Sequence, residues 1–85
     1  MIALYYWKHK NSTALHRAID LFLCDEPMTD DQIAVVREYF RQWIEDPAWD
    51  GPKAKWLRAE IDNLKTHDAL FCWRFGAKIH GMDPI

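Results

Sequence analysis

Apolar residues recur every three or four positions in three stretches of the chain, which is the spacing of one face of an α-helix. In the first stretch, Leu15, Ile19, Phe22 and Leu23 follow this spacing, and they predict a helix over residues 13–24. Pro27 follows shortly after and cannot continue that helix, because proline lacks the backbone N–H that a helix interior needs.

The second stretch carries the sharpest helix start in the sequence. Thr29 and Gln32 are spaced as a capping box, in which each side chain accepts a hydrogen bond from the other residue's backbone N–H. The apolar stripe that follows predicts a helix over residues 30–45, and Pro47 stops it. The members of that stripe are Ile33, Val36, Phe40, Trp43 and Ile44.

The third stretch is the longest and predicts one continuous helix over residues 52–75. Its apolar positions repeat like a heptad seam, with Asp68 in the one polar slot. A carboxylate on an apolar seam needs a hydrogen-bond partner, or it helps to select a binding partner. Thr66 offers an alternative, in which it caps a separate helical segment over residues 68–75. The seam consists of Leu57, Ile61, Leu64, Phe71 and Phe75.

The two ends of the chain differ from its middle. Residues 1–11 begin aromatic and then turn basic, and their weak alternation predicts an extended arm or a short strand. At the other end, we expect Gly76 to cap the last helix and residues 77–85 to form a loose tail. The predicted fold class is all-α. It is a single small domain built as a three-helix bundle, or as a helical hairpin plus a helix, with an N-terminal aromatic arm.

Tryptophan is concentrated around the turn between the second and third stretches. Trp43 lies on the second apolar stripe, Trp49 lies within the turn, and Trp56 follows early in the third stretch. We expect the three rings to form a lid over one end of a helical hairpin. The alternative is an exposed aromatic patch that grips a partner, because tryptophan is enriched at interface hot spots.

Composition adds three expectations to this pattern. A chain of 85 residues with five tryptophans, three tyrosines and four phenylalanines can fill one small core. No apolar run has the roughly 18 residues that cross a bilayer, and no signal-peptide pattern opens the chain, so we expect a cytoplasmic protein without a targeting segment. Cys24 and Cys72 lie in apolar stretches, and we expect them to be buried, reduced thiols.

Catalytic and ligand-binding patterns are missing from the sequence. The four histidines never stand at the i, i+4 spacing of two zinc ligands on one helix, and no C-x-x-C occurs. His67 and Cys72 point about 140° apart on a regular helix, so they cannot act together as base and nucleophile. Three glycines are too few for a phosphate-binding loop. We therefore expect no metal, no cofactor and no enzymatic activity.

Two clusters of basic and aromatic residues make nucleic acid an alternative partner. Lys8 and Lys10 follow the aromatic start of the chain, and Lys53, Lys55 and Arg58 surround a tryptophan. Such patches stack bases and neutralise phosphates. The net charge of −2 argues against this alternative, because dedicated nucleic-acid binders are usually strongly basic.

Protein–protein interaction is the function that the sequence favours, as an adaptor, a regulator or an assembly subunit. The aromatic surface exceeds what so small a core needs, so we expect part of it to meet another protein or a second copy of this chain. A second helix shorter than the third also leaves the end of the third to be covered by the arm, by the first helix or by a second chain. We expect no membrane and no small-molecule substrate. The candidate contact residues are Tyr5, Tyr6, Trp7, Trp49, Trp56 and Asp68.

Overall fold

The computed structural model describes residues 13–84, so the predicted arm with its candidate residues Tyr5, Tyr6 and Trp7 lies outside the described residues. The described part is all-α, as the hydrophobic pattern predicted. Its elements are α2 (Thr13–Leu23), α3 (Asp30–Ile44), α4 (Pro52–Glu60), the 3₁₀ turn η1 (Ile61–Asn63) and α5 (His67–Lys78).

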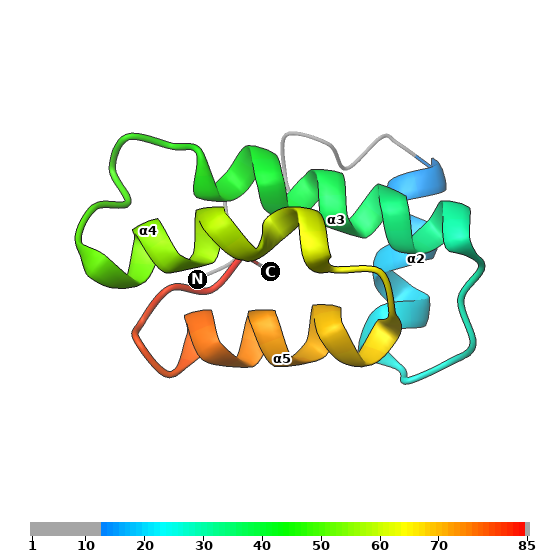
Figure 1. Ribbon diagram of the computed structural model, residues 1–85. Helices are drawn as coiled ribbons and strands as arrows, with labels where there is room; N and C mark the ends of the chain where they lie inside the picture. The colour runs from blue at the N-terminus through cyan, green and yellow to red at the C-terminus, as the bar shows by residue number, and fades with distance from the viewer. Residues whose placement is uncertain (1–12, 85) are drawn as a thin grey trace.

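Three of the helices run side by side in an up-and-down arrangement (Figure 1). Helices α3 and α4 form an antiparallel hairpin, and α5 runs along the hairpin and packs against both of them. Helix α2 stands across the end of this three-helix group where α3 begins, and it packs mainly against α3. The segment after α5 folds back toward the middle of the molecule.

Helix α3 begins as the sequence predicted. The backbone N–H of Gln32 donates to Thr29 Oγ1 at 3.2 Å, and the backbone N–H of Thr29 donates to Gln32 Oε1 at 2.9 Å. This reciprocal pair is a capping box, and it satisfies backbone donors that a helix start otherwise leaves open. The expected stripe on α3 is buried, and Tyr39 joins it.

The prediction of one continuous helix over residues 52–75 was wrong. The chain tightens into η1 after Glu60, leaves helical geometry at Leu64 and restarts at His67. The restart follows the alternative reading, because Thr66 is the N-cap of α5 and its hydroxyl accepts from the Ala69 N–H at 3.0 Å. The carbonyl of Leu64, which the break leaves without a helical partner, accepts from Arg37 Nη1 at 2.9 Å. The break is therefore supported on both sides by side-chain hydrogen bonds.

The break changes which side of α5 faces the core. Phe71 and Phe75, expected on the buried seam, are exposed, whereas Leu70, Trp73 and Ala77 are buried in their place. In a continuous helix, residues spaced by helical turns from the buried positions of α4 would also face the core. A non-helical linker instead lets α5 begin with a different rotation about its axis, so a different set of residues faces the core. The seam therefore holds only as far as Leu57, Ile61 and Leu64, which are buried.

The expected loose tail is instead anchored to the body. Gly76 lies inside α5, and the chain reverses at Gly81, whose φ is +78°. The N–H of Met82 donates to Ala77 O at 3.0 Å and that of Gly81 donates to Lys78 O at 3.0 Å, which together form a Schellman motif. Met82 and Pro84 are buried beyond it, and the Tyr39 hydroxyl donates to the Pro84 carbonyl.

Arg58 holds together the turn between α3 and α4. Its guanidinium donates to the carbonyls of Ile44 at 2.9 Å, Asp46 at 3.3 Å and Trp49 at 2.6 Å. These carbonyls lie at the end of α3 and in the turn after it, where intrahelical donors are lacking. A guanidinium carries five N–H donors in a fixed fork, so one side chain of α4 can serve the whole turn.

Of the three tryptophans of the predicted lid, the turn brings two together, Trp43 and Trp49. Trp49 folds back onto Trp43 with ring centroids 4.9 Å apart, and Trp43 is buried. Trp56 does not join them and is 47% exposed. The lid is thus a pair of rings, and the third ring lies on the surface.

The outer face of α3 binds η1 through an ion pair between Arg41 and Asp62. Arg41 also donates to Glu38 at 3.1 Å within its own helix. The hydrogen bond from Arg41, helped by its charge, lowers the pKa of Asp62 below its ordinary value of 3.8, and the same hydrogen bond raises the pKa of Arg41.

We expect Arg58→Ala to lower the free energy of unfolding by about 1–2 kcal/mol, because three carbonyls lose a charged donor and only partly regain water. Arg58→Lys should recover only part of that loss, since one ammonium cannot reach three diverging acceptors. Urea unfolding followed by circular dichroism measures both. Lys55→Ala, an exposed position on the same helix, is the matched control and should change stability by less than about 0.5 kcal/mol. Equal losses of unfolding free energy in Lys55→Ala and Arg58→Ala would contradict a stabilising role for the three Arg58 hydrogen bonds.

The Asp62 ion pair predicts an acid-side pH dependence. Because the folded pKa of Asp62 lies below its unfolded value, the pair stabilises the protein above about pH 4 and loses this effect as the pH falls through the folded pKa. An NMR titration of the Asp62 carboxyl should give a pKa below 3.8 that moves back toward 3.8 in Arg41→Gln. Glu38→Gln, which leaves the pair intact, should not move it. An unchanged titration in Arg41→Gln would exclude Arg41 as the cause.

Candidate functional site

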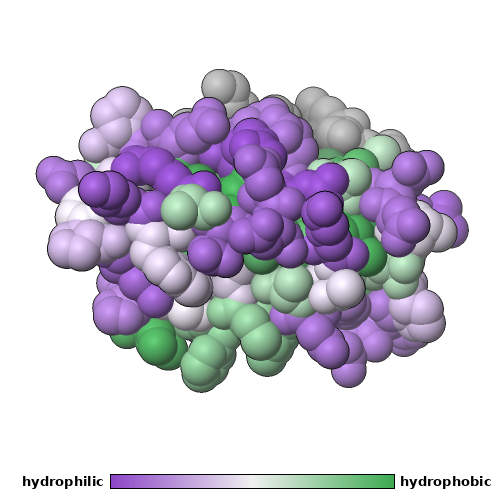
Figure 2. All heavy atoms as spheres, in the orientation of Figure 1, coloured by the Kyte–Doolittle hydropathy of each residue, from purple (hydrophilic) through white to green (hydrophobic). Residues whose placement is uncertain are grey.

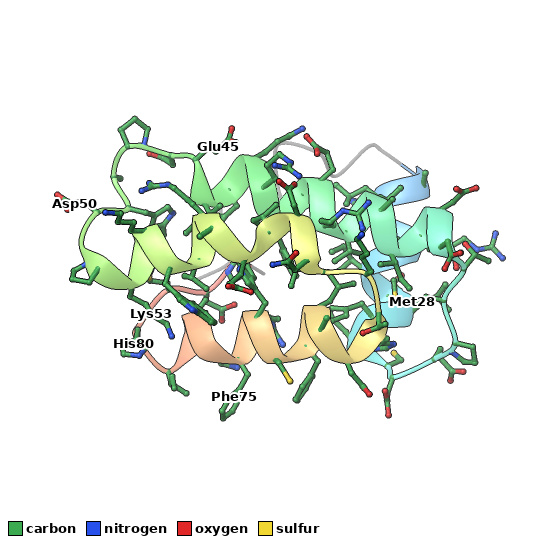
Figure 3. All side chains as sticks on the ribbon, viewed as in Figure 1. Met28, Glu45, Asp50, Lys53, Phe75 and His80 are labelled. Carbon is green, nitrogen blue, oxygen red and sulfur yellow. The ribbon has the colours of Figure 1, made fainter. Side chains whose placement is uncertain are left out.

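The outer face of α5 carries a row of large apolar side chains in solvent. Phe71, Phe75 and Ile79 are 54%, 57% and 63% exposed. They stand four residues apart, so they share one side of the helix. Figure 2 shows hydrophobic side chains gathered along the edge of the molecule where α5 runs, and Figure 3 shows Phe75 pointing away from the body. We call Phe71, Phe75 and Ile79 the α5 stripe.

The rings of the stripe are already arranged against each other. Phe71 and Phe75 have centroids 6.3 Å apart and planes inclined by only 12°. A pair of stacked rings on a helix has fewer rotamers to lose on binding than two independent side chains. The two rings therefore form one preorganised apolar surface.

The core is complete without the stripe. On the inner side of α5, Trp73 stacks on Phe40 at 4.9 Å, and its indole Nε1 donates to the Leu57 carbonyl at 3.0 Å. Leu70 and Ala77 are fully buried on the same side. The packing of α5 against its neighbours thus uses one face of the helix and leaves the stripe unused among the described residues.

One end of the stripe meets the end of α2. Asp25 takes up a left-handed conformation with φ of 56° after α2, and Leu23 remains 47% exposed there. His67, the first residue of α5, lies over the Phe22 ring at 5.3 Å, and its Nε2 is 3.2 Å from the Phe22 carbonyl oxygen and 3.7 Å from an Asp25 carboxylate oxygen. A shallow hollow between these groups opens beside Phe71. The contact fixes the start of α5 against α2 and extends the apolar surface to Leu23.

Trp56 borders α5 from the α4 side. The ammonium of Lys53 lies 4.3 Å from the centroid of the Trp56 ring, a cation–π contact. Both side chains lie over Gly76, where an added Cβ would be 3.6 Å from Lys53 Nζ and 3.9 Å from the Trp56 ring. These are ordinary van der Waals distances, so the Lys53 and Trp56 side chains pack directly against the last turn of α5.

Charged residues stand near the two ends of the stripe, in the first and last turns of α5. Asp68 lies in the first turn of α5 and Lys78 in its last, and both are exposed. Each charge is on the favourable end of the helix dipole. Arg74 lies along one flank and pairs with Asp83 at 3.7 Å. The apolar surface is thus negative at one end and positive at the other.

The structure brings together only part of the predicted contact set. Trp56 lies on the surface beside α5 and Asp68 on the surface in its first turn, whereas Trp49 is half-buried against Trp43. Sequence reasoning placed Phe71 and Phe75 in the core and Ile79 in a tail, and so missed the stripe. The capping signal of Thr66 could have found it, because a helix that restarts there places positions 71, 75 and 79 on a face of its own.

Two further expectations change with the structure. The two cysteines are free but exposed rather than buried, because Cys24 follows the last turn of α2 and Cys72 lies next to the stripe on the outer side of α5. Of the basic cluster proposed for nucleic acid, Arg58 is engaged by the turn carbonyls and Lys53 lies over Trp56, which leaves Lys55. Lys8 and Lys10 lie outside the described residues.

We expect the stripe to contribute little to stability. Phe75→Ala, measured by thermal unfolding at low protein concentration, should change the free energy of unfolding by less than about 1 kcal/mol, because little buried area is lost. Leu70→Ala on the inner face of the same helix should lose about 2–5 kcal/mol. A large loss in Phe75→Ala would mean that the stripe belongs to the core of the monomer.

Within residues 13–84, no helix combines the length and the apolar composition needed to cross a lipid bilayer. The same residues hold no group of three or more His, Cys, Asp or Glu side chains arranged to bind a metal ion. No protein-family model matches the chain, and comparison with curated proteins and with solved structures finds no significant match.

Proposed function

We propose that this protein is a small, non-catalytic protein-interaction module, acting as an adaptor, a regulator or an assembly subunit, and that the α5 stripe is its contact surface. The observation that carries the proposal is the separation of roles on α5. Its inner side completes the core through Leu70, Trp73 and Ala77, while Phe71 and Phe75 stand more than half exposed on the outer side. The largest contiguous apolar patch on a monomeric protein, typically a few hundred Å², is often a functional contact surface.

The physical gain comes from removing the stripe from water. Each of its three side chains exposes about half of its surface, so together they offer roughly 300 Å² of apolar area, given that a whole aromatic side chain presents about 150–250 Å². At about 25 cal/mol per Å², burying that area contributes about 7 kcal/mol before the costs of association. Trp56 and Asp68 are proposed to lie at the rim, where they add orientation and specificity.

The proposed partner is a protein. Nucleic acid is less favoured because the stripe contains no cluster of cations, and the Arg58 guanidinium serves the turn. We further propose a cytoplasmic location, since two exposed free thiols, Cys24 and Cys72, suit a reducing compartment. The arm residues Tyr5, Tyr6 and Trp7 remain candidates for a second contact.

Site-specific photo-cross-linking tests the proposal. Benzoylphenylalanine at position 75 replaces one aromatic side chain by another, and irradiation in cells should link the protein to a defined partner protein or to a second copy. Position 45 is the matched control, because Glu45 is exposed at the opposite side of the molecule (Figure 3). Cross-links from position 75 that disappear with Phe71→Ser support the proposal. Equal cross-linking from both positions, or none from position 75, would contradict it.

A further inference from the structure

We infer that the partner on the α5 stripe is a second copy of this chain, bound so that the two α5 helices run antiparallel across a two-fold axis level with Trp73. This inference rests on the proposed function and adds the identity of the partner. It follows from the order of side chains along the stripe.

A two-fold interface uses the same patch on both copies, so each contact occurs twice and the patch must complement itself. In an antiparallel pair of helices, residues equally far from the axis on either side meet at the same level. With the axis at position 73, Phe71 lies level with Phe75 of the partner subunit, and Phe75 with the partner's Phe71. The four rings then form one continuous apolar layer.

The charges at the ends of the stripe fit the same register. Asp68 and Lys78 lie five residues to either side of position 73, about 7–8 Å along the helix axis. Asp68 therefore comes level with Lys78 of the partner subunit, and both pairs have opposite signs. A parallel arrangement would instead set Asp68 against Asp68 and Lys78 against Lys78, which repel.

The helix dipoles favour the same orientation. Antiparallel helices bring the positive N-terminal end of one α5 to the negative C-terminal end of the other. A partner of unrelated sequence would need its own matching row of rings and charges, whereas a second copy supplies them without further assumption. The complementarity within one patch is the reason to choose the second copy.

The size of the patch sets the strength of the dimer. Roughly 300 Å² of apolar area from the stripe, with Trp56 and Leu23 at its margins, falls short of the about 800 Å² per partner of a standard stable interface. We therefore expect a dimer that forms at tens to hundreds of micromolar and dissociates on dilution.

Charge exchange between the ends of α5 tests the register. The full-length protein and its variants are studied by sedimentation equilibrium from about 10 μM to 1 mM at low salt. Asp68→Lys and Lys78→Asp should each weaken dimerisation about tenfold or more, because each sets like charges against each other at both ends of the interface. The double variant Asp68→Lys/Lys78→Asp should restore it. An equimolar mixture of the two single variants should form a heterodimer, since both of its end pairs then have opposite signs.

Matched controls separate the interface from general charge and folding effects. Glu45→Lys makes the same change of net charge as Asp68→Lys, but on the opposite side of the molecule, and should leave dimerisation unchanged (Figure 3). Phe75→Asp should abolish dimerisation across the concentration range while the helical circular dichroism stays at the wild-type level. A variant that loses its helical signal is replaced by Phe75→Ser.

The outcomes distinguish the inference from the proposed function. A monomer at every concentration, together with a specific cross-link from position 75 to another protein, overturns the inference and leaves the proposed function standing. If neither the charge-exchange variants nor Phe75→Asp changes the dimerisation constant, the dimer forms through another face, and this result also overturns the inference. A dimer-sized cross-link from position 75, together with rescue by the double variant, supports both.

Discussion

The indole of Trp73 is the point where α3, α4 and α5 meet. It stacks on Phe40, meets Trp43 edge to face at 6.0 Å and donates its N–H to the Leu57 carbonyl of α4. A buried N–H without an acceptor costs about 1–3 kcal/mol, so this hydrogen bond selects one orientation of the ring. The fixed ring in turn fixes the rotation of α5, and that rotation turns Phe75 and its neighbours outward. The surface chemistry of the protein therefore depends on a contact in its core.

Local sequence signals were enough to predict the helix boundaries that depend on nearby residues. The capping box at Thr29 and Gln32 lies within four positions, and helix α3 begins and ends within one residue of its prediction. The hydrogen bonds of Arg58 could not be foreseen, because their acceptors are backbone carbonyls at the end of α3 and in the turn, which converge on this side chain only in the folded chain. A long side chain that donates hydrogen bonds to the backbone of another element produces no periodic pattern in the sequence.

The choice between a continuous and a broken third helix decided how the candidate site was assigned. Both alternatives were open, because an N-cap such as Thr66 stabilises a helix start by only about 1 kcal/mol. Tertiary contacts settle that balance, among them the Arg37 hydrogen bond to Leu64 and the burial of Trp73. The continuous reading moved Phe71 and Phe75 into the core. The sequence therefore predicted exposed aromatic side chains, but it assigned Phe71 and Phe75 to the wrong face of the last helix.

The arrangement of the tryptophans also gives the protein a built-in optical readout. Trp43 has neighbours on both sides, with Trp49 at 4.9 Å and Trp73 at 6.0 Å, so excitation energy passes readily among the three indoles and their near-ultraviolet dichroism is coupled. Trp56 stands apart from them in solvent beneath the Lys53 ammonium. An anionic quencher such as iodide is drawn to that ring, while caesium ions are repelled from it. Fluorescence from the described tryptophans therefore separates into a shielded interior component and a surface component that reports on the border of α5.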